Sequence, residues 1–168
     1  MASNIQPIVA VSAVGGWLDA YTYNFAEGTS QTFTIGQPLI FSSGKLVIAT
    51  SVTSPTIAGI SLNKATGTAG TQSVPNCAVT LPYQEVIFQV SVDTTTTNNT
   101  AALATGKPSD FNIGTNYQML LDSTSGNYYM GTGTGNPVFT LLSVDPIYAA
   151  VINGRVNVRI LTSQTIWS

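Results

Sequence analysis

The sequence contains no histidine and a single cysteine, and it has few charged side chains. Without histidine the chain lacks the most common general base and metal ligand, and every catalytic triad built on imidazole is excluded. Cys77 stands alone, so it cannot form an internal disulfide, and zinc and iron–sulfur sites that need several thiolates are not expected. An isolated cysteine is usually a small buried apolar residue.

Carboxylates are the groups that remain for acid–base chemistry, and they are scattered singly along the chain. They are Asp19, Glu27, Glu85, Asp93, Asp110, Asp122 and Asp145. A glycosidase needs only two carboxylates that the fold brings together, but the sequence spacing gives no support for such a pair. We therefore expect a protein that is not an enzyme and that has no catalytic residues, no cofactor and no metal site.

Charged residues make up only 7% of the chain, against about 25% in an average soluble protein. The formal net charge of −2 provides no basic field that could attract nucleic acid, so we expect no nucleic-acid partner. Neutral polar side chains must cover the surface instead. They can pack against a neighbouring protein without the desolvation cost of a buried charge, which suits a protein held in an ordered assembly. A soluble protein that has few charges is the alternative.

Long apolar runs are also missing. No stretch approaches the roughly 20 apolar residues of a membrane helix. The amino-terminal residues lack the basic start of a secretory signal. We therefore expect no membrane partner, and synthesis and folding in a reducing cytoplasm.

Residues that suit β-strands are abundant, notably Val, Ile, Thr, Tyr and Phe. The clearest strand is expected over residues 85–93, where apolar and polar side chains alternate. A second is expected over residues 155–161, paired with residues 148–152 across the turn dipeptide Asn153-Gly154. Further strands are expected over residues 32–35, 38–41, 45–52, 56–62, 117–121, 127–130 and 138–144.

Helical patterns are few, and only a short turn over residues 100–104 is expected. Many short strands separated by turns predict an all-β fold. We expect a small β-barrel over residues 31–168, because closure removes the open edges of a sheet. Residues 1–30 differ in character and are predicted to form an extended N-terminal arm. This arm either needs a partner to pack on or covers one end of its own barrel.

The predicted arm carries four aromatic residues at odd-numbered positions, Trp17, Tyr21, Tyr23 and Phe25. If the arm is extended, all four lie on one side of the chain. Such a row is costly to leave in water, and aromatic side chains dominate the energetics of interfaces. These four residues are therefore the candidate contacts with another subunit or a partner protein.

Three loop segments superficially match functional motifs. Residues 130–136 are rich in glycine but lack the Lys and the following helix of a phosphate-binding loop. Residues 122–127 offer one carboxylate where a calcium loop needs several oxygen ligands, so a β-turn is expected. The threonine-rich residues 94–100 include the glycosylation pattern Asn98-Asn99-Thr100, which has no route to modification without a secretory signal. We predict a solvated loop there.

Residues 36–50 read GQPLIFSSGKLVIAT and are followed by IAGIS at residues 57–61 and by a Gly/Thr loop at residues 66–71. This order of strand, short turn, strand, apolar IAGI strand and loop resembles the small head decoration (capsid cement) proteins of tailed bacteriophages. Further similar stretches lie at residues 85–92, 117–129 and 145–161, the last including GRVNVRI.

This resemblance implies a β-barrel or β-tulip-like domain, usually a homotrimer, that binds the major capsid protein outside the shell near threefold positions. The protein would be made in the host cytoplasm and located on the capsid exterior of the virion, where it stabilises the shell by bridging subunits. Trp17, Tyr21, Tyr23 and Phe25 would then be capsid or subunit contacts. The family has no catalytic or cofactor residues to carry over.

The alternative function is a receptor- or glycan-binding module of a phage tail fibre. Such a module would also be neutral, rich in Thr and Asn, and built from β-structure. Exposed rings such as Tyr128, Tyr129 or Trp167 could then stack on sugars. The same rings otherwise fill the core or a subunit interface.

Overall fold

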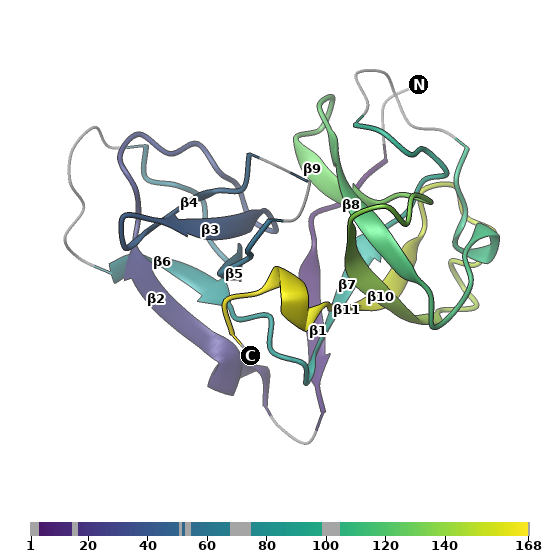
Figure 1. Cartoon of the computed structure of the whole chain (residues 1–168), viewed down its shortest axis with the longest axis horizontal. Helices are drawn as coiled ribbons and strands as arrows, with labels where there is room; N and C mark the ends of the chain where they lie inside the picture. Colours follow the sequence, from purple (N-terminus) through teal and green to yellow (C-terminus); the bar gives the residue numbers. More distant parts are fainter. Residues whose placement is uncertain are drawn as a thin grey trace.

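The computed structural model describes residues 4–14, 17–50, 52, 55–67, 75–98 and 105–167. The described chain is all-β, with two antiparallel sheets and almost no helix (Figure 1). The six-stranded sheet has the order β1-β7-β11-β10-β8-β9, and the five-stranded sheet has the order β2-β6-β5-β3-β4. The predicted fold class is therefore confirmed at the level of an all-β protein.

The strands of the six-stranded sheet are β1 (Val9–Ala13), β7 (Val86–Ser91), β8 (Asn116–Asp122), β9 (Asn127–Met130), β10 (Pro137–Val144) and β11 (Arg155–Ile160). Those of the five-stranded sheet are β2 (Thr22–Ala26), β3 (Pro38–Ser42), β4 (Lys45–Ile48), β5 (Gly59–Ser61) and β6 (Pro75–Thr80). Three short 3-10 helices accompany them, η1 (Leu18–Tyr21), η2 (Pro108–Asp110) and η3 (Thr162–Gln164).

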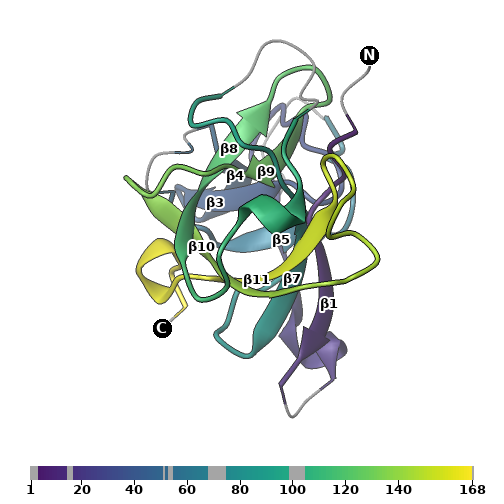
Figure 2. The ribbon, with the colours of Figure 1, turned by 90° about the vertical axis from the view of Figure 1, so that its right-hand side faces the viewer.

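Along the central strands of the six-stranded sheet, buried side chains alternate with partly exposed ones, and the buried side chains form the larger core. In β11, Val156, Val158 and Ile160 are buried, while Arg155 and Arg159 are partly exposed on the other face. β7 lies between β1 and β11, as Figure 2 shows, and its buried side chains join the same core. The alternating patterns predicted at residues 85–93 and 155–161 are therefore confirmed as strands with one buried face.

A second, smaller core is formed by buried residues of the five-stranded sheet and its flanking segments. It is formed by Phe33, Leu39, Leu46, Ala58, Cys77, Val79 and Leu81. Gly59 on β5 lies so close to β6 that an added Cβ would stand 2.7 Å from the Cβ of Val79. Only glycine allows this approach, which explains the glycine within the IAGIS segment.

Neither sheet is a closed barrel within the described residues, so the predicted barrel is not shown. In the five-stranded sheet a single parallel bridge between Glu27 and Leu46 joins the two edge strands at one end. In the six-stranded sheet Met130 forms one bridge with Val92, just beyond β7. The edges of the five-stranded sheet therefore meet at one point, whereas in the six-stranded sheet the edge strand β9 meets the end of β7 and not the other edge strand, β1. Neither contact is a continuous ladder of hydrogen bonds.

Hydrogen bonds between distant segments hold the two sheets together. The Tyr128 hydroxyl on β9 donates to the carbonyl of Ala49, which follows β4, at 2.5 Å. The Gln37 amide donates to the carbonyl of Gly126 at 2.5 Å. At the C-terminal end, Thr165 forms a parallel bridge with Ile57.

The segment predicted to be an arm contributes a strand to each sheet. β1 pairs with β7 and β2 pairs with β6, both antiparallel. Ile8, just before β1, is buried in the larger core. The described part of residues 1–30 therefore packs on the chain's own sheets and does not extend away from them.

Most predicted strands overlap an observed one, but two do not. Residues 148–152 form turns, since the N–H of Tyr148 donates to Asp145 O and that of Val151 to Tyr148 O. β11 therefore pairs with β10 and β7 instead of forming the predicted hairpin. Residues 32–35 form no strand, because Phe33 is drawn into the core and the Gln37 side chain accepts the N–H of Thr34.

The sequence patterns did not predict β1, β2 and β6. β1 and β2 each contain an irregularity in their pairing, which interrupts the alternation that marks a strand. The helical turn predicted over residues 100–104 lies outside the described residues.

Candidate functional site

Five aromatic side chains from distant segments form a chain of ring contacts. The centroid distances are 5.8 Å for Tyr21 and Tyr83, 6.0 Å for Tyr83 and Trp167, 6.2 Å for Trp167 and Phe25, and 5.2 Å for Phe25 and Phe41. All lie in the range of favourable aromatic pairs. All five rings are half-buried, so each keeps a part that faces solvent.

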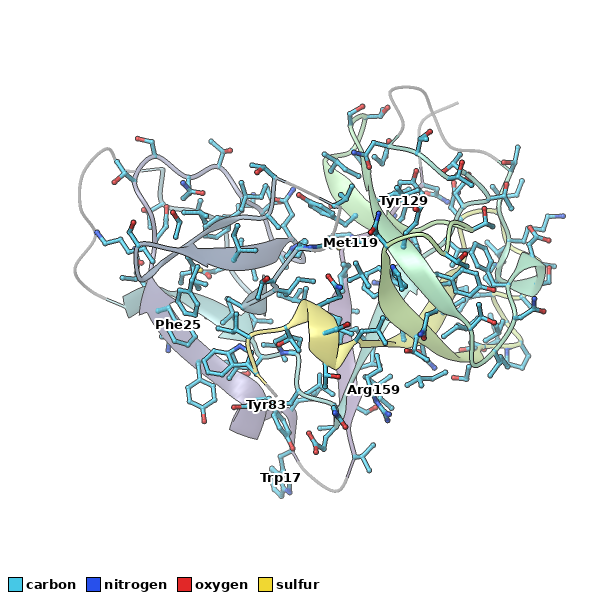
Figure 3. The ribbon with its side chains drawn as sticks, viewed as in Figure 1. Trp17, Phe25, Tyr83, Met119, Tyr129 and Arg159 are labelled. Carbon is cyan, nitrogen blue, oxygen red and sulfur yellow. The ribbon has the colours of Figure 1, made fainter. Side chains whose placement is uncertain are left out.

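Two exposed aromatic side chains adjoin this chain of rings. Trp17, just before η1, is 84% exposed, and Tyr23 on β2 is 49% exposed. In Figure 3 Trp17 projects from the lower tip of the molecule, with Tyr83 above it and Phe25 to the left. We call the set Trp17, Tyr21, Tyr23, Phe25, Phe41, Tyr83 and Trp167 the aromatic surface.

The C-terminal segment fixes one end of the aromatic surface. The indole N–H of Trp167 donates to the carbonyl of Ala58 at 2.7 Å, and its backbone N–H donates to the Thr165 hydroxyl at 3.0 Å. Thr165 itself forms a parallel bridge with Ile57, just before β5. The Trp167 ring is therefore held in one orientation and supports Phe25 and Tyr83.

The four predicted contact residues do not form one continuous row. η1 interrupts the extended chain between Trp17 and β2. Tyr21 and Phe25 pack into the ring chain, whereas Trp17 and Tyr23 face solvent. Phe41 and Tyr83 were not predicted, because neither lies near the predicted arm in sequence.

Tyr128 and Tyr129 are not part of this surface. They are 1% and 0% exposed, so the alternative in which they fill the core is confirmed and they cannot stack on sugars. The Tyr129 hydroxyl lies 2.7 Å from the hydroxyl of Thr95. Burial raises the pKa of each phenol to about 12.

Comparisons with protein-family models, with curated proteins and with solved structures find no match. In the part of the chain that the structure describes, no helix is both long and apolar enough to span a membrane. The function must therefore be inferred from the chain's own residues.

The buried carboxylates have structural partners. Asp93 accepts N–H groups of Thr105 and Gly106 and an amide N–H of Asn153, and so ties two loops together. Glu27 accepts the N–H of Thr66 at 2.9 and 3.1 Å. Among the described residues no group of three or more His, Cys, Asp or Glu side chains could hold a metal ion.

Asp122 stabilises the predicted β-turn. Its carboxylate accepts the N–H groups of Thr124 and Ser125 at 3.2 Å each. Residues 123–126 form turns between β8 and β9, as expected. The Asp122 carboxylate therefore stabilises the turn of the β8–β9 hairpin.

The described part of the threonine-rich loop, residues 94–98, is mostly exposed, as predicted, but it is anchored on β8. The Gln118 amide donates to the carbonyl of Thr96 at 2.6 Å, and the N–H of Leu121 donates to the Asn98 side chain at 3.0 Å. A cavity of about 240 Å³ lies beside this loop, lined in part by Asn98, Gln118 and Asn136. Met119, labelled in Figure 3, lies among its apolar lining residues.

Cys77 is fully buried on β6. Burial, together with the charge of Glu27, raises the pKa of its thiol to about 12. A thiol in this state is almost entirely protonated near neutrality, and the thiolate is the reactive form. Cys77 is therefore a core residue and not a nucleophile.

Proposed function

We propose that the protein is a non-enzymatic structural protein of a phage virion, bound to the major capsid protein on the capsid exterior as a decoration or cement protein. The observation that carries this proposal is the exposure of Trp17 and Tyr23 beside the half-buried rings of the aromatic surface. Aromatic side chains are favoured anchors of protein interfaces. The resemblance of residues 36–61 to head decoration proteins supports the same function.

The energy available at this surface suits attachment to a shell. Burying a large apolar side chain contributes roughly 1.5–3 kcal/mol. Trp17 and Tyr23 together would supply about 3–6 kcal/mol before the costs of association. A contact of this size is weak alone, but several copies that bridge neighbouring capsid subunits bind collectively far more tightly.

The proposal includes a homotrimer and a β-tulip-like fold, as the resemblance implies. A chain with so few charges gains solubility if exposed apolar side chains are shared between copies. Sedimentation equilibrium should give about three times the mass of the chain. A mass that stays monomeric as the protein is concentrated would refute the trimer but not the capsid contact.

Co-sedimentation with empty, expanded capsids tests the capsid contact. We expect saturable binding in a fixed ratio to capsid subunits, and at least 100-fold weaker binding for the double variant Trp17→Ala and Tyr23→Ala. The control variant Ile147→Ala removes a side chain that is 78% exposed in the turn after β10 and should bind like the parent. Deleting residues 1–30 is a poor test, because it also removes β1 and β2.

Unchanged binding of the folded double variant would place the attachment elsewhere. No binding of the parent protein to capsids would refute the capsid function.

A glycan- or receptor-binding module of a tail fibre is the second candidate. The cavity beside the threonine-rich loop favours it, because Asn98, Gln118 and Asn136 provide neutral amides near apolar side chains, a lining suited to a neutral sugar. Binding to host cells without binding to capsids would support this function. Replacing Asn136, which is exposed, with Ala should then weaken cell binding and leave folding unchanged.

A further inference from the structure

A pocket opens where β10 and β11 meet the start of the C-terminal segment. Its volume is about 190 Å³, and its lining residues are Gln84, Thr140, Arg159, Ile160, Leu161 and Thr162. It is smaller than the roughly 300–1,000 Å³ of pockets for drug-sized ligands, so it suits a single chemical group or a very small molecule. Arg159, labelled in Figure 3, is the only charged residue of the lining.

Arg159 lacks a partner among the described residues. It lies on the outward face of β11, opposite Thr140 of β10, and its Nε is buried without a hydrogen bond. The other arginine, Arg155, also has a buried Nε without a hydrogen bond, but its Nη2 donates to the carbonyl of Pro7 at 2.6 Å. A buried donor of a charged group that has no acceptor is costly, so this position favours an acceptor from outside the chain.

The rest of the lining suits an anion. The Gln84 amide and the Thr162 hydroxyl form no hydrogen bond within the described residues, so both can donate. The Thr140 hydroxyl already donates to Asn116 at 2.7 Å.

We propose that this pocket binds one oxyanion, a carboxylate or a phosphate group, through the guanidinium of Arg159 with Gln84 and Thr162 as further donors. The planar guanidinium offers two parallel N–H groups that match the two oxygens of a carboxylate or phosphate. The group can belong to a free small anion or to an acidic side chain of a partner protein. This inference does not depend on the proposed capsid function.

NMR of the arginine Nε–Hε groups gives a direct test, because the chain contains only two arginines. Acetate and inorganic phosphate are titrated separately into the protein at low chloride concentration. We expect the Arg159 signal to shift saturably with Kd in the millimolar range, while the Arg155 signal stays in place. Arg159→Gln should abolish the titration, and Thr162→Val should weaken it severalfold.

Lys45→Gln is the matched control for loss of one positive charge, because Lys45 lies on β4 of the other sheet and should leave the titration unchanged. Glu85 directly follows the lining residue Gln84 in the chain, and Glu85→Gln tests whether it is the partner of Arg159 in solution. The inference is overturned if neither anion gives a saturable shift. It is also overturned if both arginine signals move together, or if Glu85→Gln alone moves the Arg159 signal as far as phosphate does.

Two otherwise identical neutral peptides, one with a central Asp and one with Asn, distinguish the source of the anion. At least 10-fold tighter binding of the Asp peptide than of acetate would identify a partner protein's side chain. Equal binding of the Asp peptide and acetate would identify a free small anion. Equal binding of the Asp and Asn peptides at this pocket would overturn the oxyanion assignment.

Discussion

Replacing Tyr128 with Phe should weaken the junction between the two sheets. The Tyr128 hydroxyl donates to the carbonyl of Ala49, and both residues are buried to within 1%. The variant leaves that carbonyl without its donor, and an unsatisfied buried polar group costs about 1–3 kcal/mol. We therefore expect about 2 kcal/mol of lost stability, which for a chain of this length lowers Tm by roughly 4–8 °C.

Urea unfolding at pH 7 measures this loss, with Tyr23→Phe as the matched control. The Tyr23 side chain is half exposed, so removal of its hydroxyl should change stability by less than about 0.5 kcal/mol. Equal stability of Tyr128→Phe and the parent would refute the reasoning. So would an equal loss in Tyr23→Phe, because it would show that the effect does not depend on the junction.

The same variant has a distinctive pH dependence. Burial raises the pKa of Tyr128 from 10.0 to about 12. The unfolded chain therefore ionises first, so this contribution to stability is complete below pH 10 and is lost as the pH rises through 12. A shift of this size corresponds to at most about 3 kcal/mol. Phe does not ionise, so the deficit of the variant should shrink above pH 10, and a constant deficit from pH 8 to 11.5 would contradict this account.

Gly106→Ala should lower the free energy of unfolding in urea by about 3 kcal/mol or more, because an added Cβ would lie 2.2 Å from the Cα of Asp93. Gly135→Ala should be neutral, because an added Cβ there has nothing within 4 Å. Equal stabilities of the two variants would refute this packing effect. Tyr129, whose pKa burial also raises to about 12, should remain largely un-ionised in the folded protein at pH 10.5, and a difference in phenolate absorbance between the parent and Tyr129→Phe at that pH would contradict this. Cys77 should resist alkylation at pH 8 until the chain unfolds, and rapid labelling of the folded protein would contradict its burial.

Local alternation was enough to predict the central strands of the larger sheet. In β7 and β11 one face is buried in a continuous core and the other is partly exposed, so the period of two is visible in the sequence. The fold class could be predicted because it depends on these strong patterns. Closure could not, because it depends on whether edge strands far apart in sequence meet over many residues. Here the edges of the smaller sheet meet at one bridge, and in the larger sheet β9 reaches the end of β7 and not the edge strand β1.

The failed hairpin shows a different limit. Asn153 does adopt the left-handed conformation that its turn dipeptide favours, with φ of 55°. The turn dipeptide was therefore recognised correctly. Its partner strand was not, because residues 148–152 are held in turns and the neighbours of β11 come from β7 and β10. Pairing partners depend on tertiary contacts that a short window does not contain.

The aromatic surface could be predicted only in part for the same reason. The sequence marked Trp17, Tyr21, Tyr23 and Phe25 because they lie close together in the chain. Tyr21 and Phe25, however, find their ring partners in Tyr83, Phe41 and Trp167, which are 16 to 142 residues away. Only folding brings these rings together, so the sequence located the surface without showing which rings would remain exposed.

The aromatic surface forms only when the chain is folded and the two sheets are packed together. Tyr83 packs against both hydrophobic cores, and the indole N–H of Trp167 donates to the carbonyl of Ala58, just before β5. A partner that covers these rings would bind the folded arrangement and not the unfolded chain. Such a partner stabilises the fold by about 2.7 kcal/mol when its concentration is 100 times Kd. If the proposed capsid contact is correct, capsid-bound protein should therefore unfold at a higher temperature than free protein, and loss of Trp17 and Tyr23 should remove that gain.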